Sequence, residues 1–194
     1  MKLKIYLGPS IFTSYFENFK SRAIEVLFSE IEKGNFFGFY SLLTIDELSF
    51  LPSPLKENTL NLIKKSKLYL CEFEPEDIVH LVQNYLEEKI LVPEMEFAAC
   101  HFAIATINEM DIFASVDTTY SANEFLYRRF KKVNQKFGYA KTPEIRMPEE
   151  ITGVPGPYEN LKLIHQIRKQ KYEERKEKNI SLLDYLISLQ KKEF

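Results

Sequence analysis

The stretch that decides the fold runs from residue 100 to residue 117 and reads CHFAIATINEMDIFASVD. Its first part is almost entirely apolar and belongs to a predicted helix over Glu94–Met110. After a short polar turn, Ile112–Val116 is a continuous apolar run of the kind found in buried parallel strands, and Asp117 follows it. An apolar helix that leads into a buried strand predicts a sheet covered by helices.

The chain before and after this stretch alternates between strand-like and helix-like segments. We therefore expect an α/β fold, a three-layer α/β/α sandwich with a mostly parallel sheet of four or five strands. The predicted strands are Lys4–Leu7, Phe37–Tyr40, Leu68–Glu72, Ile112–Val116 and an edge strand over Pro143–Arg146. The other predicted helices are Ser14–Glu32, Ile45–Leu51, Leu55–Lys65, Pro75–Lys89 and Asn123–Phe137.

Composition places the chain among ordinary globular proteins. Of its 194 residues, 45% are hydrophobic and 28% charged, which is too apolar for a disordered chain. Cys71 and Cys100 both lie in apolar contexts and lack the spacing of a metal site, so we expect reduced, buried thiols. There is no signal-peptide pattern and no apolar run long enough to cross a membrane, which favours a cytoplasmic protein without a membrane partner.

A Gly/Pro-rich stretch over 153–157 can continue neither a helix nor a strand, so we interpret it as a hinge. It would separate a domain over 1–152 from a helical tail over 158–194, in which Ser181 starts a second helix. The tail holds nine Lys and Arg against six Asp and Glu, a net charge of +3, which leaves −5 on the rest of the chain. This asymmetry predicts that the tail docks on an acidic body, its own or a partner's.

The first strand with the Gly8-Pro9-Ser10 that follows it, taken with residues 100–117, resembles the PIN-domain family, the fold of VapC-type toxin ribonucleases. In that family four acids from strand ends and neighbouring helices bind Mg²⁺ or Mn²⁺, which activates water. The resemblance implies that Glu47 is the acid of the middle helix and Asp117 the last acid. Gly8 and Ala98 stand where the other two acids are expected.

Two carboxylates in place of four are expected to hold a divalent metal poorly, because each missing anion is a lost ligand and lost attraction. We therefore expect Glu47 and Asp117 to form a remnant acidic site that needs no cofactor, with Mg²⁺ or Mn²⁺ there only if the site is active. Ser10 keeps a hydroxyl found at this place in the family. Asp46 is an alternative for the middle acid, and Glu94 or Glu96 could stand in for the missing third acid.

The tail resembles the short antitoxins that pair with PIN toxins. Ile167, Arg168, Tyr172, Glu173 and Lys176 fall on an Ile-Arg-x-x-x-Tyr-Glu-x-x-Lys pattern. In such pairs the antitoxin helix lies on the toxin and a basic side chain enters the acidic pocket, as an amphipathic helix in a groove with a charge-assisted contact. The resemblance implies that Arg168 and Tyr172 dock the tail, in cis or in trans. The alternative is a helical pair that only packs or dimerises.

A basic patch falls within the predicted helix over Asn123–Phe137. Its residues are Arg128, Arg129, Lys131, Lys132 and Lys136. Such a patch can hold RNA phosphates, although a solvated helix face is the commoner explanation of this charge density.

Three functions compete. The first, which we favour, is a catalytically impaired PIN-like protein that binds or regulates in a toxin–antitoxin-like context. The second is a metal-dependent endoribonuclease with a rearranged acidic site, and the third is an RNA-binding module that does not hydrolyse RNA. We also expect a homodimer and no DNA binding by the body.

Overall fold

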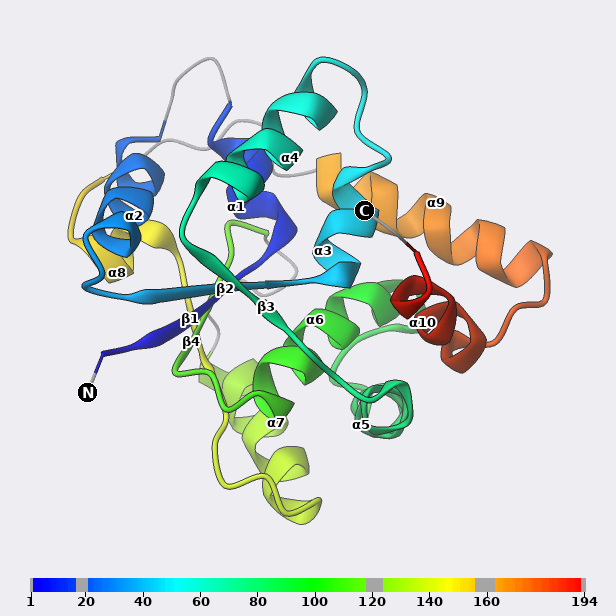
Figure 1. Cartoon of the computed structure of the whole chain (residues 1–194). Helices are drawn as coiled ribbons and strands as arrows, with labels where there is room; N and C mark the ends of the chain where they lie inside the picture. The colour runs from blue at the N-terminus through cyan, green and yellow to red at the C-terminus, as the bar shows by residue number, and fades with distance from the viewer. Residues whose placement is uncertain (1, 17–20, 118–123, 156–162, 193–194) are drawn as a thin grey trace.

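The computed structural model describes residues 2–16, 21–117, 124–155 and 163–192, and it confirms the predicted α/β sandwich (Figure 1). Five strands form one parallel sheet in the order β3-β2-β1-β4-β5. The strands are β1 (Lys4–Leu7), β2 (Phe37–Ser41), β3 (Leu68–Cys71), β4 (Ile112–Ala114) and β5 (Glu144–Arg146). The helices are α1 (Pro9–Ser14), α2 (Arg22–Glu32), α3 (Leu42–Leu48), α4 (Leu55–Lys65), α5 (Pro75–Glu87), η1 (Pro93–Met95), α6 (Glu96–Ile107), α7 (Glu124–Lys136), α8 (Pro148–Thr152), α9 (Leu163–Glu177) and α10 (Leu182–Gln190).

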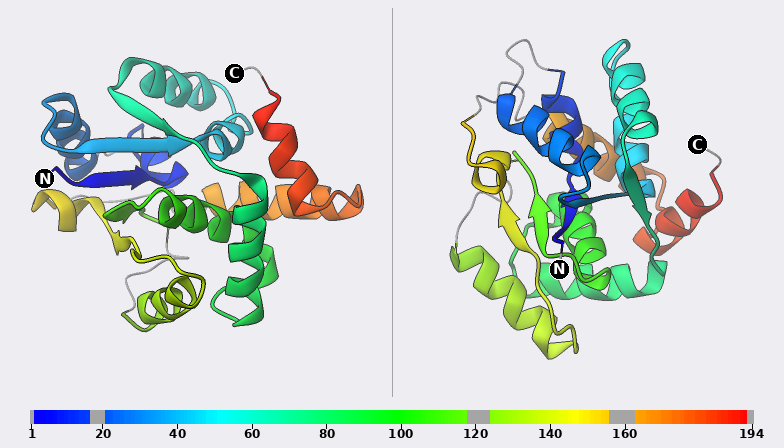
Figure 2. Two further views of the ribbon diagram at one scale, coloured as in Figure 1. Left: turned by 60° about the horizontal axis from the view of Figure 1, so that its bottom comes forward. Right: turned by 60° about the vertical axis from the view of Figure 1, so that its left-hand side comes forward.

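The two faces of the sheet carry separate cores, because successive side chains of a strand point to opposite faces. On β1, Tyr6 packs with residues of α5, α6 and α7, and its ring stacks on Phe113 of β4 with centroids 5.5 Å apart. Ile5 and Leu7 point the other way and pack with residues of α1, α2 and α4. Figure 2 shows the helices on both sides of the strands.

Two of the predicted helices differ from the structure by several residues at their start, α4 has its predicted bounds, and the others differ by a few residues at their ends. The predicted helix over Ser14–Glu32 is wrong, because α1 already begins at Pro9, where the fixed φ of proline suits a first helical residue, and α2 begins after Ser21. The short helix α3 begins earlier than predicted, since the Ser41 hydroxyl accepts a hydrogen bond from the Thr44 amide in a capping box. This start places the acids of α3 within regular helix.

The tail helices α9 and α10 cross the carboxyl edge of the sheet and enter both cores (Figure 1). Ile164 and Ile167 of α9 are buried with the α1–α2 core, whereas Leu186 and Leu189 of α10 are buried with the α5–α6 core. The predicted start of α10 is confirmed, because the Ser181 hydroxyl accepts a hydrogen bond of 3.0 Å from the Asp184 amide. The end of the predicted hinge and the first tail residues, 156–162, lie outside the described residues.

Both cysteines are buried free thiols, as expected, and burial raises the pKa of the Cys71 thiol to about 12. Within the ranges that the structure describes, no helix has both the length and the apolar character needed to cross a membrane.

Shortening a buried tail side chain is expected to destabilise the whole protein. Leu186→Ala removes a fully buried side chain from the α5–α6 core and is expected to lower the free energy of unfolding by about 2–5 kcal/mol. Lys191→Ala, at an exposed position of the same tail, should change it by less than about 0.5 kcal/mol. Urea unfolding followed by circular dichroism measures both. Equal stability of the two variants would mean that α10 is not part of the cooperative core.

Candidate acidic site

Glu47 and Asp117, the two acids identified from the sequence, are brought together by a tail arginine. Arg168 of α9 donates from Nε to both carboxylate oxygens of Glu47, at 3.1 and 3.0 Å, and from Nη1 to Asp117 Oδ2 at 2.6 Å. The three side chains are at most 3% exposed. The guanidinium of Arg168 therefore lies between the two carboxylates of the same chain.

A buried polar chain holds Glu47 from the body side. The Tyr6 hydroxyl lies 2.6 Å from His101 Nδ1 and 2.7 Å from Ser41 Oγ, at the start of α3. His101 Nε2 lies 3.1 Å from Glu47 Oε1, with a geometry too bent for a hydrogen bond. Burial lowers the pKa of His101 despite the nearby Glu47 carboxylate.

Asp46, the neighbour of Glu47 on α3, binds a second set of tail residues. Its carboxylate accepts hydrogen bonds from Lys171 Nζ of α9 and from the Tyr185 hydroxyl of α10. Lys192 adds a third contact, with Nζ 2.7 Å from Asp46 Oδ1. Lys171 also lies over the ring of Phe50, 3.8 Å from its centroid, a cation–π contact that further fixes the ammonium.

A third acid, Glu96 at the start of α6, meets the far end of α9. Arg175 donates from Nε to Glu96 Oε1 at 2.8 Å and from Nη2 to Oε2 at 2.6 Å, a bidentate pair with both side chains 6% exposed. Arg168, Lys171 and Arg175 are three and four residues apart, which places them on one face of the helix. Three cations on one face of α9 therefore pair with four buried carboxylates on the body, and Lys192 after α10 supplies a fourth positive charge.

The pKa values of Asp46, Glu47, Glu96 and Lys171 are shifted in directions set by burial and charged partners. Burial alone would raise the pKa of Glu47 and of Asp46, but the Arg168 and Lys171 charges outweigh it, and both pKa values are lowered. For Glu96 burial outweighs Arg175 and the pKa is raised. Burial also lowers the pKa of Lys171 against the pull of Asp46.

Gly8 and Ala98, at the two positions where the resemblance leads us to expect acids, are closely surrounded. A Cβ added at Gly8 would lie 3.1 Å from the carbonyl oxygen of Ala114, tighter than an ordinary contact. The backbone of Gly8 is extended, with φ −64°, so the position does not require glycine for its conformation. Ala98 is buried in α6. The body therefore leaves little room for a carboxylate beside β1 without a local shift.

Ser10 holds the loop that carries Asp117. Its hydroxyl lies 3.1 Å from Ser115 Oγ and accepts a hydrogen bond of 3.2 Å from the Val116 amide. Ser115 Oγ in turn accepts from the Asp117 amide at 3.0 Å. The contacts of this hydroxyl are thus to the end of β4 and the residues after it.

The donor set does not fit a divalent metal site. Glu47 and Asp117 are the two carboxylates at the remnant site, and Arg168 bridges them. Glu94 is exposed on η1, and Glu96 is paired with Arg175. In the part of the chain that the structure describes, no group of three or more His, Cys, Asp or Glu side chains is placed to hold a metal ion.

The basic patch of α7 lies apart from α9 in all the ribbon views (Figures 1 and 2). Arg128 pairs with Glu124 at 2.6 Å, and Arg129 donates to the backbone carbonyl of Lys89 at 3.0 Å. Lys131, Lys132 and Lys136 of the same patch are exposed. RNA binding by these residues stays a prediction, as does a solvated helix face.

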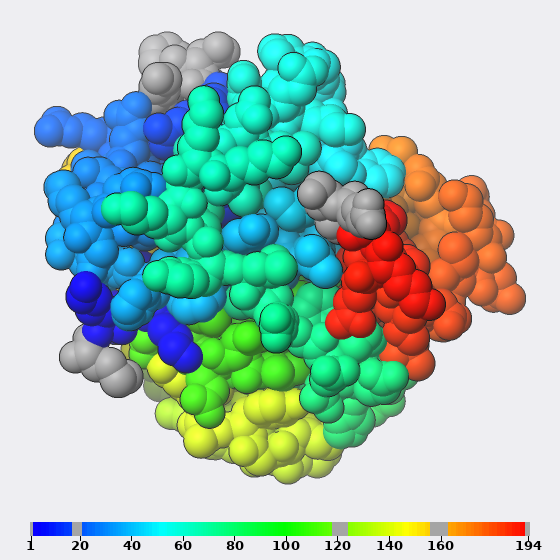
Figure 3. Space-filling view, in the orientation of Figure 1, coloured from blue at the N-terminus to red at the C-terminus, as the bar shows by residue number. Residues whose placement is uncertain are grey.

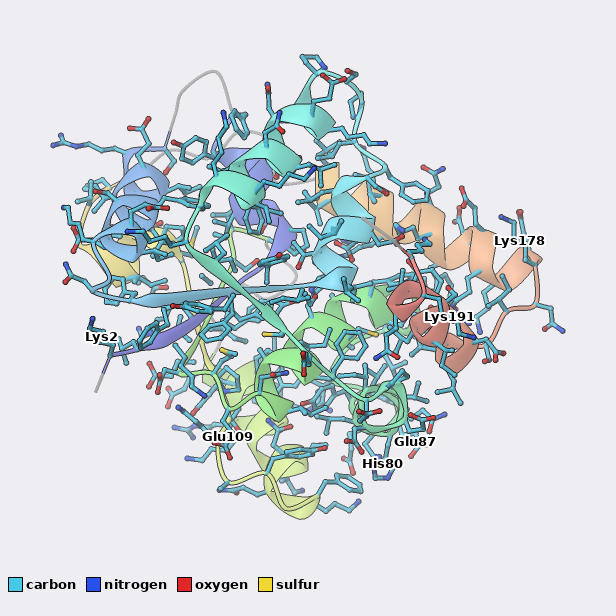
Figure 4. All side chains as sticks on the ribbon, viewed as in Figure 1. Lys2, His80, Glu87, Glu109, Lys178 and Lys191 are labelled. Carbon is cyan, nitrogen blue, oxygen red and sulfur yellow. The ribbon has the colours of Figure 1, made fainter. Side chains whose placement is uncertain are left out.

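Tyr172, the second predicted docking residue, is half-buried against the α5–α6 core rather than bonded to the acids. The cationic groups of Arg175 and Lys176 lie 6.0 and 5.5 Å from its ring centroid. Sequence reasoning missed Lys171 and Arg175, although their spacing from Arg168 was a usable signal. Figure 4 shows other tail lysines, Lys178 among them, on the outside of the molecule.

Comparison with known proteins identifies no family for this chain. No family model and no curated protein matches the sequence. A solved structure, FitAcB from Neisseria gonorrhoeae, is similar with 13% sequence identity and a TM-score of 0.47, over 74% of this chain and 97% of that chain. Similarity at this level assigns neither a family nor an activity.

Removing the bridging cation is expected to be costly. Arg168→Met keeps most of the side-chain volume but leaves two buried carboxylates unpaired, so the free energy of unfolding should fall by about 3–5 kcal/mol. Lys169→Met, at the neighbouring exposed residue, should change it by less than about 1 kcal/mol. Chemical denaturation at neutral pH measures the difference. A loss no larger in Arg168→Met than in Lys169→Met would contradict the buried bridge.

Acid is expected to loosen the tail. The pKa values of Glu47 and Asp46 lie below their ordinary values of 4.5 and 3.8, so their contribution to stability is present above those values. It is lost as the pH falls through the lower folded values. Glu96 acts in the opposite sense, because its pKa is raised and protonation relieves a buried charge. We expect the free energy of unfolding to decrease between about pH 5 and pH 3.

The matched measurement uses Arg168→Met over the same pH range. Without the guanidinium, burial should raise the pKa of Glu47, so this variant should lose less stability on acidification than the natural protein. Equal slopes for the two proteins would mean that Arg168 does not set the titration of Glu47.

Proposed function

We propose that this chain is a PIN-like domain with a disabled acidic site, and that it acts as a binding or regulatory module in a toxin–antitoxin-like context. The proposal rests on one observation above all: the guanidinium of Arg168 lies between Glu47 and Asp117, where the resemblance would place a divalent metal. A bound guanidinium satisfies the two carboxylates electrostatically but offers no open coordination position for water.

The missing acids support the same conclusion. Gly8 and Ala98 provide no oxygen ligand, and a hard divalent cation prefers six or more oxygen donors. Glu96, which is close in sequence to Ala98, does not replace the missing acid, because Arg175 holds it in a bidentate pair. Chemistry through a metal at this site therefore lacks ligands as well as space.

The way in which the tail is bound supports a binding role. Its cations and apolar side chains occupy the edge of the parallel sheet, where open α/β folds usually bind ligands. A partner that contacts this edge must either displace α9 or recognise it together with the body. We propose that the body and the docked tail together form the surface that a partner binds.

The second candidate function is a metal-dependent endoribonuclease with a rearranged acidic site, and one observation favours it. Asp46, Glu47, Glu96 and Asp117 are all neutralised by the tail, so a displaced α9 would leave four carboxylates uncovered. In that case the tail would be a removable plug on a working site. The two candidate functions predict different metal binding when Arg168 is replaced.

Calorimetric titration of Mn²⁺ into the full chain tests the proposal. We expect no binding by the natural protein and no binding tighter than millimolar by Arg168→Met, because two carboxylates remain too few. Neither protein should cleave RNA in the presence of Mn²⁺. Lys169→Met serves as the control for loss of a tail charge that does not touch the acids.

The opposite outcome is well defined. Micromolar Mn²⁺ binding by Arg168→Met that disappears in Arg168→Met/Glu47→Gln, together with RNA cleavage, would replace the proposal by the plugged endoribonuclease. The full chain is used because Leu186 and Leu189 are part of the core, and a truncated chain without them would expose that core to water.

A further inference from the structure

A pocket lies on the surface of the molecule, apart from the acidic site. It has a volume of about 500 Å³ and lies between β2, β3, α3 and α4, with the residues that follow α10 at its border. Its apolar wall is formed by Leu42, Ile45, Leu60, Ile63 and Leu70. In the space-filling view, residues of α4 and β3 lie on the same face as those of α3 and α10 (Figure 3).

The charged residues that line this pocket are all lysines. Lys56 and Lys64 of α4 flank Leu60 at spacings of four residues, so one stripe of the helix presents cation, apolar group and cation. Within the described ranges, neither lysine makes an ion pair. Lys192 also lines the pocket, but its charge is shared with Asp46. The lining residues include no acid.

Most of the apolar wall is partly open to solvent, whereas Ile63 is buried. Leu70, on the edge strand β3, is 45% exposed, and Leu42, Ile45 and Leu60 are half-buried. Lysines on a helix surface are usually just solvated, but here they border an apolar hollow of a size typical of small-molecule sites. A few charged groups beside an apolar wall fix the head of a ligand while the wall buries its body.

We propose that this pocket binds a small amphipathic anion, a carboxylate on an unbranched alkyl chain. The head pairs with Lys56 or Lys64, and the chain lies along the apolar side chains of α3, α4 and β3. A ligand with a neutral head would form no ion pair with the lysines, and the lysines would repel a ligand with a cationic head. Because the pocket does not include Glu47, Asp117 or Arg168, the proposal stands or falls independently of the proposed function.

The test uses octanoate as the probe, below its micelle concentration and at low salt, with the full chain followed by backbone amide NMR. We expect saturable shifts confined to β2, β3, α3, α4 and the residues after α10. Octanol should bind at least about fivefold more weakly and octylammonium should not bind, because the attraction of the head to lysine is worth roughly one kcal/mol.

Substitutions in the pocket separate the contribution of the carboxylate head of the ligand from that of its alkyl chain. Lys56→Met/Lys64→Met keeps the apolar stems and should weaken octanoate binding at least about fivefold while leaving octanol unchanged. Lys65→Met, an exposed neighbour on α4 that does not line the pocket, should bind octanoate as the natural protein does. Leu70→Thr retains a strand-forming residue and should weaken octanoate and octanol alike.

Three results would overturn the proposal. One is the absence of saturable octanoate binding by the natural protein. Another is equal binding of octanoate by Lys56→Met/Lys64→Met and Lys65→Met, which would remove the role of the two lysines. The third is a set of shifts centred away from α3, α4 and β3, which would place the ligand elsewhere.

Discussion

Four carboxylates buried at the carboxyl edge of the sheet constrain the rest of the structure. Charges removed from water are strongly unfavourable unless cations and hydrogen bonds compensate them. On the body side, the group next to Glu47 is His101, and burial lowers the pKa of this histidine and so disfavours its positive charge. The compensation comes instead from α9, through Arg168, Lys171 and Arg175. The position of the tail follows from this requirement as much as from its apolar residues.

The tail is bound by two kinds of interaction that act at different places. Ile167 of α9 and Leu186 of α10 enter cores on opposite faces of the sheet, so burial of apolar surface clamps the tail around its edge. The ion pairs between these anchors set the register of α9, since a shift by one residue would leave charges unpaired. Apolar burial and buried ion pairs thus both hold the tail against the body.

Much of this arrangement could be predicted from the chain. The apolar run before Asp117 predicted a buried parallel strand, which is β4, and the antitoxin-like pattern singled out Arg168. Helix bounds near the sheet were less predictable, because Pro9 and the Ser41 cap act through local backbone geometry. The pairs of Lys171 and Arg175 lie more than 75 residues apart in sequence, and no local pattern specifies such partners.

The sequence by itself determined the α/β class, the presence of Glu47 and Asp117 as candidate acids, and a basic tail with helical periodicity. These features are local, because they depend on residue type and on spacing along one strand or helix. Only the tertiary structure decided that the tail folds back on its own body and that Arg168 lies between Glu47 and Asp117. It also decided which lysines border an open apolar pocket and which are buried in ion pairs. Those outcomes depend on which elements meet at the edge of the sheet, and packing across the whole chain fixes that.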